Sequence, residues 1–223
     1  PFPAVLFNHG SGTTPERQSA QSAAVGPVFA KHGYVFLFLF RRGSGLSADQ
    51  GTSAVDLMDR ELAANGQEAR NKLQLQLLQT DQLNDGLAGL AFLRALPEVD
   101  TRRVAVVGHS FGGSLTLLMA ERDTTLSAAV VFSGSAGSWE HSPQLRARLL
   151  AAVDRTTVPV FFLTAANDYS VAPAATLSAE MARLGKPHRV KIYAPVGRTA
   201  AEAHDFVFVS VAAWEPDVFA FLS

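Results

Sequence analysis

A serine in a tight turn between a strand and a helix is the first candidate for chemistry in this sequence. Residues 108–112, Gly-His-Ser-Phe-Gly, match the pattern Gly-x-Ser-x-Gly, with an apolar β-branched run before them (104–107) and a stretch of helical composition after them (114–120). Such a turn forces its central residue into a sparsely populated backbone conformation that exposes the hydroxyl, and the flanking glycines let strand and helix approach closely. The pattern alone also fits an ordinary glycine-rich turn, but the flanking elements favour a nucleophile elbow with Ser110 at its apex.

A serine hydroxyl is a poor nucleophile at neutral pH, so Ser110 requires a general base within hydrogen-bond reach. His204 is the predicted base, because it follows the last predicted strand, and a loop at that place opens on the same sheet edge as the elbow. The sequence holds five other histidines, which are His9, His32, His109, His141 and His188. His109 lies inside the elbow, where a side chain at its position normally points away from the nucleophile.

Asp168 is the predicted acid that orients His204. The chain order in this type of site is nucleophile, acid, histidine, and Asp168 directly follows the predicted strand that lies between the other two. Glu202 and Asp205 are too close to His204 along the chain to align with its imidazole. Asp154 precedes that strand and is therefore expected at the opposite sheet edge.

Two backbone amides are predicted to stabilise the negative charge that develops on a substrate oxygen when Ser110 attacks. Phe111 begins the helix after the elbow, and Ser11 lies in the glycine-rich loop 8–12 that follows the first predicted strand. Such a loop can also cradle a phosphate. However, Pro15 stands where a dinucleotide fingerprint needs glycine, and no Gly-Lys-Ser/Thr follows.

Alternating strands and helices must position these residues. The expected strands are residues 4–7, 34–40, 103–107, 126–132, 158–164 and 189–193. The expected helices are residues 15–32, two or three helices within 54–96, residues 144–153, residues 173–184 and a last segment 206–222 that Pro216 bends or divides. This alternation predicts a doubly wound α/β fold, with a mostly parallel sheet covered by helices on both faces. We expect a single domain spanning residues 1–223.

The composition excludes several classes of protein. Of the 223 residues, 48% are apolar, and the net charge of −1 gives no reason to expect a nucleic-acid partner. There is no cysteine and no His-Glu-x-x-His, so neither a disulfide nor a metal site is expected, and no cofactor is implied. The longest apolar run, 34–40, is too short to span a membrane. The sequence begins at Pro1, so an N-terminal piece could have been removed; a cytoplasmic and a secreted location both stay open, as does the oligomeric state.

Taken together, these motifs resemble those of the α/β-hydrolases, and within them the dienelactone hydrolase-like serine esterases and related peptidase-type hydrolases. The matching stretches are Asn8-His9-Gly10, residues 42–47 (Arg-Gly-Ser-Gly-Leu-Ser), residues 108–113, residues 167–173 and His204-Asp205-Phe206. The resemblance implies Ser110 as nucleophile, Asp168 as acid and His204 as base. It also implies an antiparallel strand pair ahead of the first expected strand, and this pair is missing from the sequence given. Dienelactone hydrolases proper use a cysteine nucleophile, and the serine here favours an ester as substrate.

We therefore predict a serine hydrolase that cleaves carboxylic esters, with short-chain or small ester and lactone substrates, through an acyl-enzyme. Residues 133–155 hold only about one helix, so we expect no large cap and a shallow, open site. Trp139, Tyr169 and Met58 are candidate apolar wall residues, although core packing would explain each of them equally well. The alternatives are a peptidase or acyltransferase with the same triad, or a non-catalytic ligand-binding protein on this fold.

Overall fold

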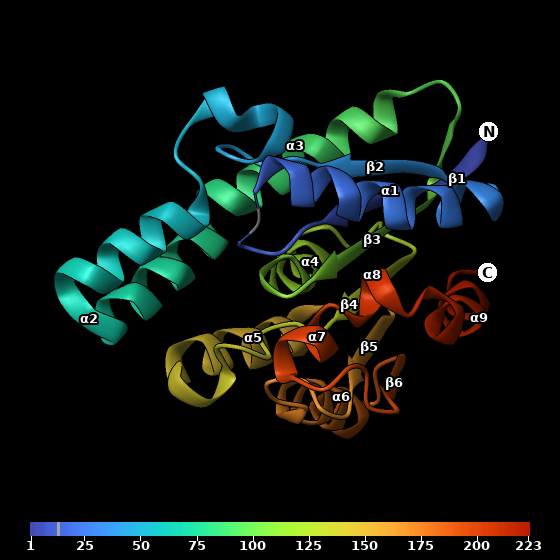
Figure 1. Cartoon of the computed structure of the whole chain (residues 1–223). Coiled ribbons are helices and arrows are strands. Elements are labelled where there is room, and N and C mark those ends of the chain that lie inside the picture. Colours follow the sequence, from blue (N-terminus) through green and yellow to red (C-terminus); the bar gives the residue numbers. More distant parts are fainter. Residues whose placement is uncertain (13) are drawn as a thin grey trace.

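The centre of the protein is a six-stranded sheet in which every neighbouring pair of strands is parallel (Figure 1). This computed structural model describes residues 1–12 and 14–223. The strand order is β2-β1-β3-β4-β5-β6, and the strands span Phe2–Asn8 (β1), Val35–Leu39 (β2), Val99–His109 (β3), Ala128–Phe132 (β4), Val160–Ala165 (β5) and His188–Tyr193 (β6). Strands β4 and β5, most of β1 and the second half of β3 are apolar runs because both of their faces are covered.

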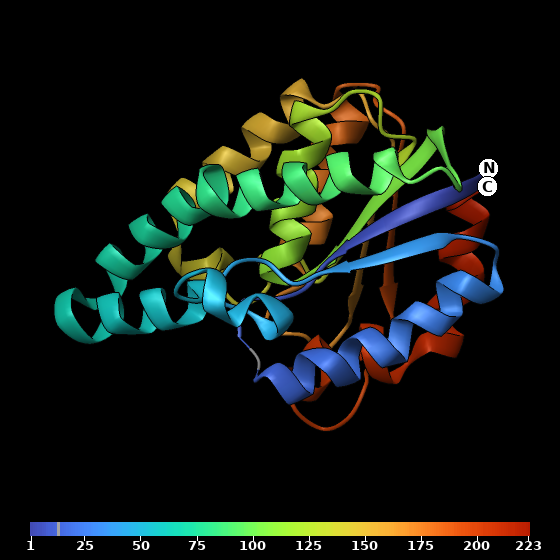
Figure 2. The same cartoon turned by 90° about the horizontal axis from the view of Figure 1, so that it is seen from above.

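Helices cover both faces of the sheet, and each face has its own hydrophobic cluster (Figure 2). One face carries α2 (Ala54–Gln79), α3 (Asp81–Ala95), α4 (Phe111–Arg122), α5 (Pro143–Arg155) and α6 (Ala172–Arg183); the other carries α1 (Pro15–Lys31), α8 (Phe206–Val209) and α9 (Val211–Leu222). Short elements complete the chain: the 3-10 turns η1 (Gly45–Gln50) and η2 (Trp139–His141), and the helix α7 (Ala200–His204). The predicted α/β class is confirmed. None of the helices within the described ranges is both long and apolar enough to cross a membrane.

The last segment departs from its prediction. The sequence suggests a break at Pro216, but the helix divides six residues earlier, at Ser210. Pro216 lies inside α9 and is tolerated there. The division has its own stabilising contact, because the buried Trp214 donates from its indole nitrogen to the Val207 carbonyl at 2.9 Å.

A second difference concerns α2, which lies beside the carboxyl ends of the strands. As expected, the segment after β4 holds little more than α5, but α2 is two helices joined at Gly66, where φ is 83°. Figures 1 and 2 show its first part running away from the sheet and its second part returning beside it. This helical hairpin (residues 54–79) contributes Met58, Arg70 and Gln74 to the wall of a cavity. It therefore builds a wall where the sequence predicts a shallow, open site.

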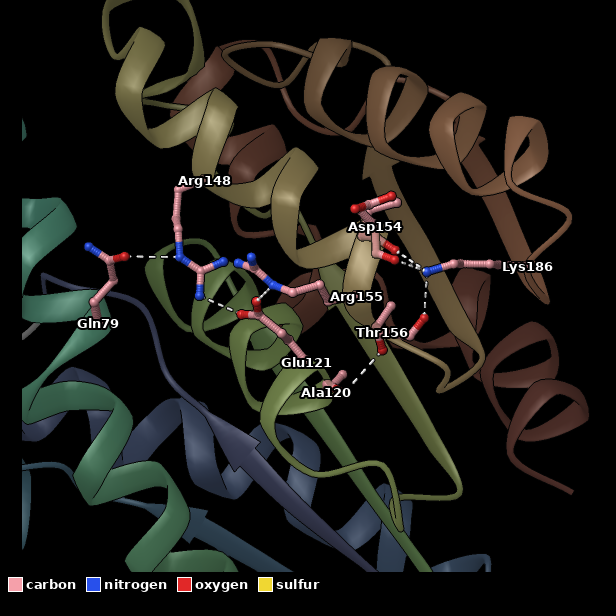
Figure 3. Close-up of polar contacts among 9 residues, drawn as sticks. Gln79, Ala120, Glu121, Arg148, Asp154, Arg155, Thr156 and Lys186 are labelled. Carbon is pink, nitrogen blue, oxygen red and sulfur yellow. Dashed lines mark hydrogen bonds and ion pairs between the residues drawn. The ribbon is translucent and has the colours of Figure 1, made fainter.

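A polar cluster at the C-terminal end of α4 connects α4, α5 and α2 (Figure 3). Glu121, near the end of α4, accepts from both Arg148 and Arg155 of α5, and Arg148 also donates to Gln79 of α2 at 2.9 Å. Nearby, Lys186 donates to three backbone carbonyls at the end of α5, where a helix leaves acceptors unpaired. Because Ser110 lies at the opposite end of α4, this cluster fixes the helix that begins at the elbow.

Candidate active site

Ser110 occupies a sharp turn between β3 and α4. Its backbone has φ 57° and ψ −120°, a conformation that side-chain-bearing residues rarely adopt, and its amide donates to the Phe132 carbonyl of β4 at 2.9 Å. The glycines of the motif permit the turn: a Cβ on Gly108 would lie 2.3 Å from the Gly112 carbonyl oxygen, and one on Gly112 would lie 2.1 Å from the Asn8 carbonyl oxygen. The turn follows the carboxyl end of β3 and lies beside the end of β1, where the strand order reverses and ligands of open α/β sheets usually bind.

His204 reaches Ser110 from the C-terminal end of α7. Its Nε2 lies 2.8 Å from the Ser110 Oγ, so the hydroxyl can donate to the imidazole. The sequence suggests a loop here, whereas His204 is the last residue of a five-residue helix. Thr199 and Glu202 form a capping box that begins this helix, and each side chain bonds a backbone amide that the helix start would otherwise leave unpaired.

Asp168 lies just beyond β5 and faces the other ring nitrogen of His204. The Nδ1–H of His204 donates to Oδ1 at 2.8 Å, while the Thr164 hydroxyl donates to Oδ2 at 2.9 Å and the Tyr169 amide to Oδ1 at 2.7 Å. Burial alone would raise the pKa of this carboxyl, but the hydrogen bond and charge of His204, with the other donors, hold the pKa below its ordinary value. Asp168 is therefore ionised at neutral pH and able to stabilise an imidazolium.

The two expected amide donors both border the same cavity. Phe111 is the first residue of α4, where helical amides are unpaired and the helix dipole is positive. Ser11 follows Gly10, where a Cβ would lie 3.4 Å from the Ser110 Cβ, so the β1 loop lies directly against the elbow. Neither amide donates to another residue of the described ranges.

Arg41 is a buried arginine that supports the loop after β1. Arg41 is 1% exposed; its Nη2 donates to the His9 carbonyl at 2.8 Å and its Nε to Gln82 at 2.7 Å. Burial lowers the pKa of Arg41 to about 9, against the opposing charge of Asp85. The sequence signal is modest, since Arg41 simply follows the strand that becomes β2.

The cavity in front of Ser110 has a volume of about 520 Å³ and is lined mainly by polar groups. Met58 and Tyr169 border it as expected, and the Tyr169 ring packs edge-on against the His204 ring. Trp139 does not border it: its side chain is 4% exposed and lies in the core beneath the helices, so it is corrected from a wall residue to a core residue. The wall also has polar members that no sequence motif marks, chiefly Arg17, Gln21, Arg70 and Gln74.

The other candidate groups have different partners. Asp205 pairs with Arg17 of α1, and Glu202 serves the start of α7, so neither faces the His204 imidazole. His32 contacts Glu215, while His141 and His188 contact nearby backbone carbonyls. Within residues 1–12 and 14–223, no group of three or more His, Asp or Glu side chains converges to hold a metal ion.

Comparisons with known proteins identify a matching family model and a similar curated protein. The model of the dienelactone hydrolase family matches residues 5–212. The quorum-quenching protein AidA of Acinetobacter baumannii is 27% identical over 128 residues, which is 57% of this chain but 34% of that protein.

Among solved structures, Est1E of Butyrivibrio proteoclasticus with bound ferulic acid superimposes with a TM-score of 0.69 at 18% identity, covering 99% of this chain and 90% of that one. The acylaminoacyl peptidase of Pyrococcus horikoshii gives a TM-score of 0.64 at 16% identity, covering 99% of this chain and 36% of that one. These two similarities show the fold. The chain thus spans about a third of the length of both AidA and the peptidase.

Proposed function

The chain belongs to the dienelactone hydrolase family, and from this membership and the site geometry we propose that it is a serine hydrolase of carboxylic esters, small lactones included. Ser110 is the proposed nucleophile, His204 the general base and Asp168 the acid that orients it. The observation that carries the proposal is the continuous chain of hydrogen bonds from the Ser110 hydroxyl through both nitrogens of His204 to the buried Asp168 carboxylate. A hydroxyl, an imidazole and a carboxylate in this order activate a nucleophile.

In the proposed first half-reaction, the Ser110 Oγ attacks the ester carbonyl carbon while its proton passes to His204 Nε2. The carbonyl oxygen becomes an oxyanion, which the amides of Ser11 and Phe111 stabilise. His204 then returns the proton to the leaving alkoxide oxygen as the carbon–oxygen bond breaks, which leaves an acyl group on Ser110. In a lactone, the alcohol stays attached to the acyl group because the ring opens.

In the second half-reaction, water takes the place of the alcohol. His204 accepts a proton from the water as its oxygen attacks the acyl carbon, and then donates it to Ser110 Oγ as the acyl–enzyme bond breaks. Asp168 stays ionised throughout and stabilises the imidazolium in both steps.

The size of the cavity supports a small substrate. A volume of about 520 Å³ lies within the range of small-molecule sites, and the helical hairpin closes one of its sides. Arg17, Arg70 and Gln74 border it, so a substrate with polar groups fits this wall better than a long hydrocarbon chain.

Hydrolysis of p-nitrophenyl acetate and butyrate by the wild type, Ser110→Ala and Ser19→Ala tests the proposal. Ser19 is an exposed serine of α1, so its replacement is a matched control. We expect Ser110→Ala to lower kcat by up to about 10⁶-fold and Ser19→Ala to change it little. Near-normal turnover by Ser110→Ala contradicts the proposal. Peptide and thioester substrates in the same assay separate esterase from peptidase and acyltransferase chemistry.

A further inference from the structure

We propose that His109 and Asn167 are positioning residues that hold the segment carrying His204 in register with Ser110 and Asp168. This inference rests on the proposed function, in which His204 is the general base. Each of the two residues directly precedes a member of the proposed triad: His109 precedes Ser110, and Asn167 precedes Asp168. Both reach the main chain of the segment that carries the base.

His109 contacts the backbone of His204. Its side chain is 4% exposed, and its Nε2 lies 2.8 Å from the His204 carbonyl oxygen. A carbonyl only accepts, so the proton must be on Nε2. Burial and then the neighbouring His204 lower the pKa of His109 to about 3, so the ring is neutral and has one N–H to donate. Its Nδ1 is buried without a hydrogen bond to any described residue, as expected for the tautomer that has its proton on Nε2 and donates to the His204 carbonyl.

Asn167 holds the same segment at a point nearer β6. Its Nδ2 donates to the Val196 carbonyl at 3.0 Å, and its Oδ1 accepts from the Val196 amide at 2.8 Å. The side chain thus pairs with one backbone residue as a neighbouring strand would, and it does so four residues ahead of α7. The loop that carries Asp168 is therefore fastened to the loop that leads to His204.

The segment needs such support because α7 has only five residues, too few to be stable by itself. The elbow contacts His204 twice, through the Ser110 hydroxyl on the side chain and through His109 on the main chain. The acid loop also makes two contacts, through Asp168 on the imidazole and through Asn167 on Val196. A displacement of reacting groups by about 1 Å can cost on the order of 10²-fold in rate.

Matched substitutions separate positioning from packing. In His109→Gln the amide nitrogen can take the place of Nε2, whereas His109→Met has a similar length and no donor. Asn167→Leu keeps the side-chain shape, removes both bonds and affects a residue only partly buried, so it provides a second test if His109→Met fails to fold. His188→Met removes a comparable histidine–carbonyl contact, to Lys186 at 2.9 Å, far from the site and serves as control.

For ester hydrolysis we expect His109→Met and Asn167→Leu to lower kcat by about 10- to 100-fold with KM nearly unchanged. His109→Gln should regain most of the loss, and His188→Met should match the wild type. In a His204→Ala background, His109→Met should change the residual rate by less than about twofold, because its effect passes through His204. Equal losses in the Gln and Met variants, or an equal loss without His204, overturn the proposal.

The low-field proton NMR signal of the His204–Asp168 hydrogen bond gives a readout that does not depend on turnover. Its assignment comes from the loss of the signal in His204→Ala. We expect the signal to broaden or shift in His109→Met and Asn167→Leu and to be retained in His109→Gln and His188→Met. An unchanged signal in His109→Met and Asn167→Leu overturns the positioning role, whether or not the wild type hydrolyses an ester. Failure of the wild type to hydrolyse any ester contradicts only the proposed function.

Discussion

Replacing Gly112 by alanine tests whether the close approach of β1 and α4 builds the elbow. The added Cβ would lie 2.1 Å from the Asn8 carbonyl oxygen and 2.3 Å from that of His9, more than 1 Å inside ordinary contact, which begins near 3.4 Å. Both obstacles are backbone atoms at the end of β1, so α4 must move away from that strand. We expect a loss of about 3 kcal/mol in the free energy of unfolding, the upper end of typical overpacking, and a fall in Tm of about 6–12 °C.

The same movement displaces Ser110 and the Phe111 amide, so kcat for p-nitrophenyl acetate should fall by about 10²-fold. Gly26→Ala is the matched control. Gly26 also lies inside a helix, but its nearest neighbour is the Phe36 side chain at 3.4 Å, so an alanine fits there. Because Pro27 follows and disfavours a helical residue with a Cβ, the gain in helix propensity is opposed, and we expect stability to change by less than about 1 kcal/mol and kcat to stay unchanged. Urea unfolding and initial rates measure both effects. Wild-type stability and kcat in Gly112→Ala would show that the close approach of β1 and α4 does not build the elbow.

Three further outcomes follow from the structure. Because the pKa of buried His109 is depressed to about 3, the unfolded state binds more protons than the folded state between about pH 3 and pH 6.5, so the free energy of unfolding falls as the pH drops through this range. Urea unfolding at several pH values should show that the dependence of this free energy on pH is smaller in His109→Gln by about 1.4 kcal/mol per pH unit, and an unchanged dependence contradicts the expectation. Glu121→Gln leaves the largely buried Arg148 without its carboxylate and should lower the free energy of unfolding by about 2–3 kcal/mol, less than the loss of a fully buried pair because Arg155 is half exposed. Glu68→Gln breaks an exposed pair with Lys72 and should leave the urea midpoint unchanged, and equal midpoints in the two variants would show that the cluster adds no stability. Met58→Ala widens the cavity and should raise the kcat/KM ratio of p-nitrophenyl hexanoate to acetate by about tenfold, and an unaltered ratio would place the acyl group elsewhere.

The sequence predicted the class of the fold because its local signals agree with one another. Each inner strand contains an apolar run that is followed by a glycine or polar turn, and parallel strands then place Ser110, Asp168 and His204 at one edge of the sheet. The positions of these three residues could therefore be proposed before any coordinates. Their distances could not, because they depend on how the loops fold back on the sheet.

The features that the sequence did not reveal depend on packing between distant segments. Asn65-Gly66 is a helix-ending signal, but the surrounding residues are helical in composition, so the sequence predicts two or three helices within 54–96 without placing the reversal at Gly66. Trp139 shows the same limit, since residue type does not distinguish a core position from a cavity wall. His109 borders the cavity of Ser110, and its contact with the main chain of His204 is visible only in three dimensions.

A fluorophosphonate probe, with mass spectrometry of the digested peptides, identifies the reactive serine of the folded protein. We expect a single modified residue, Ser110, and a strongly reduced labelling rate in His204→Ala, because the hydroxyl then has no base. Absence of label on Ser110 in the folded wild type, or labelling at the same rate without His204, would contradict this expectation.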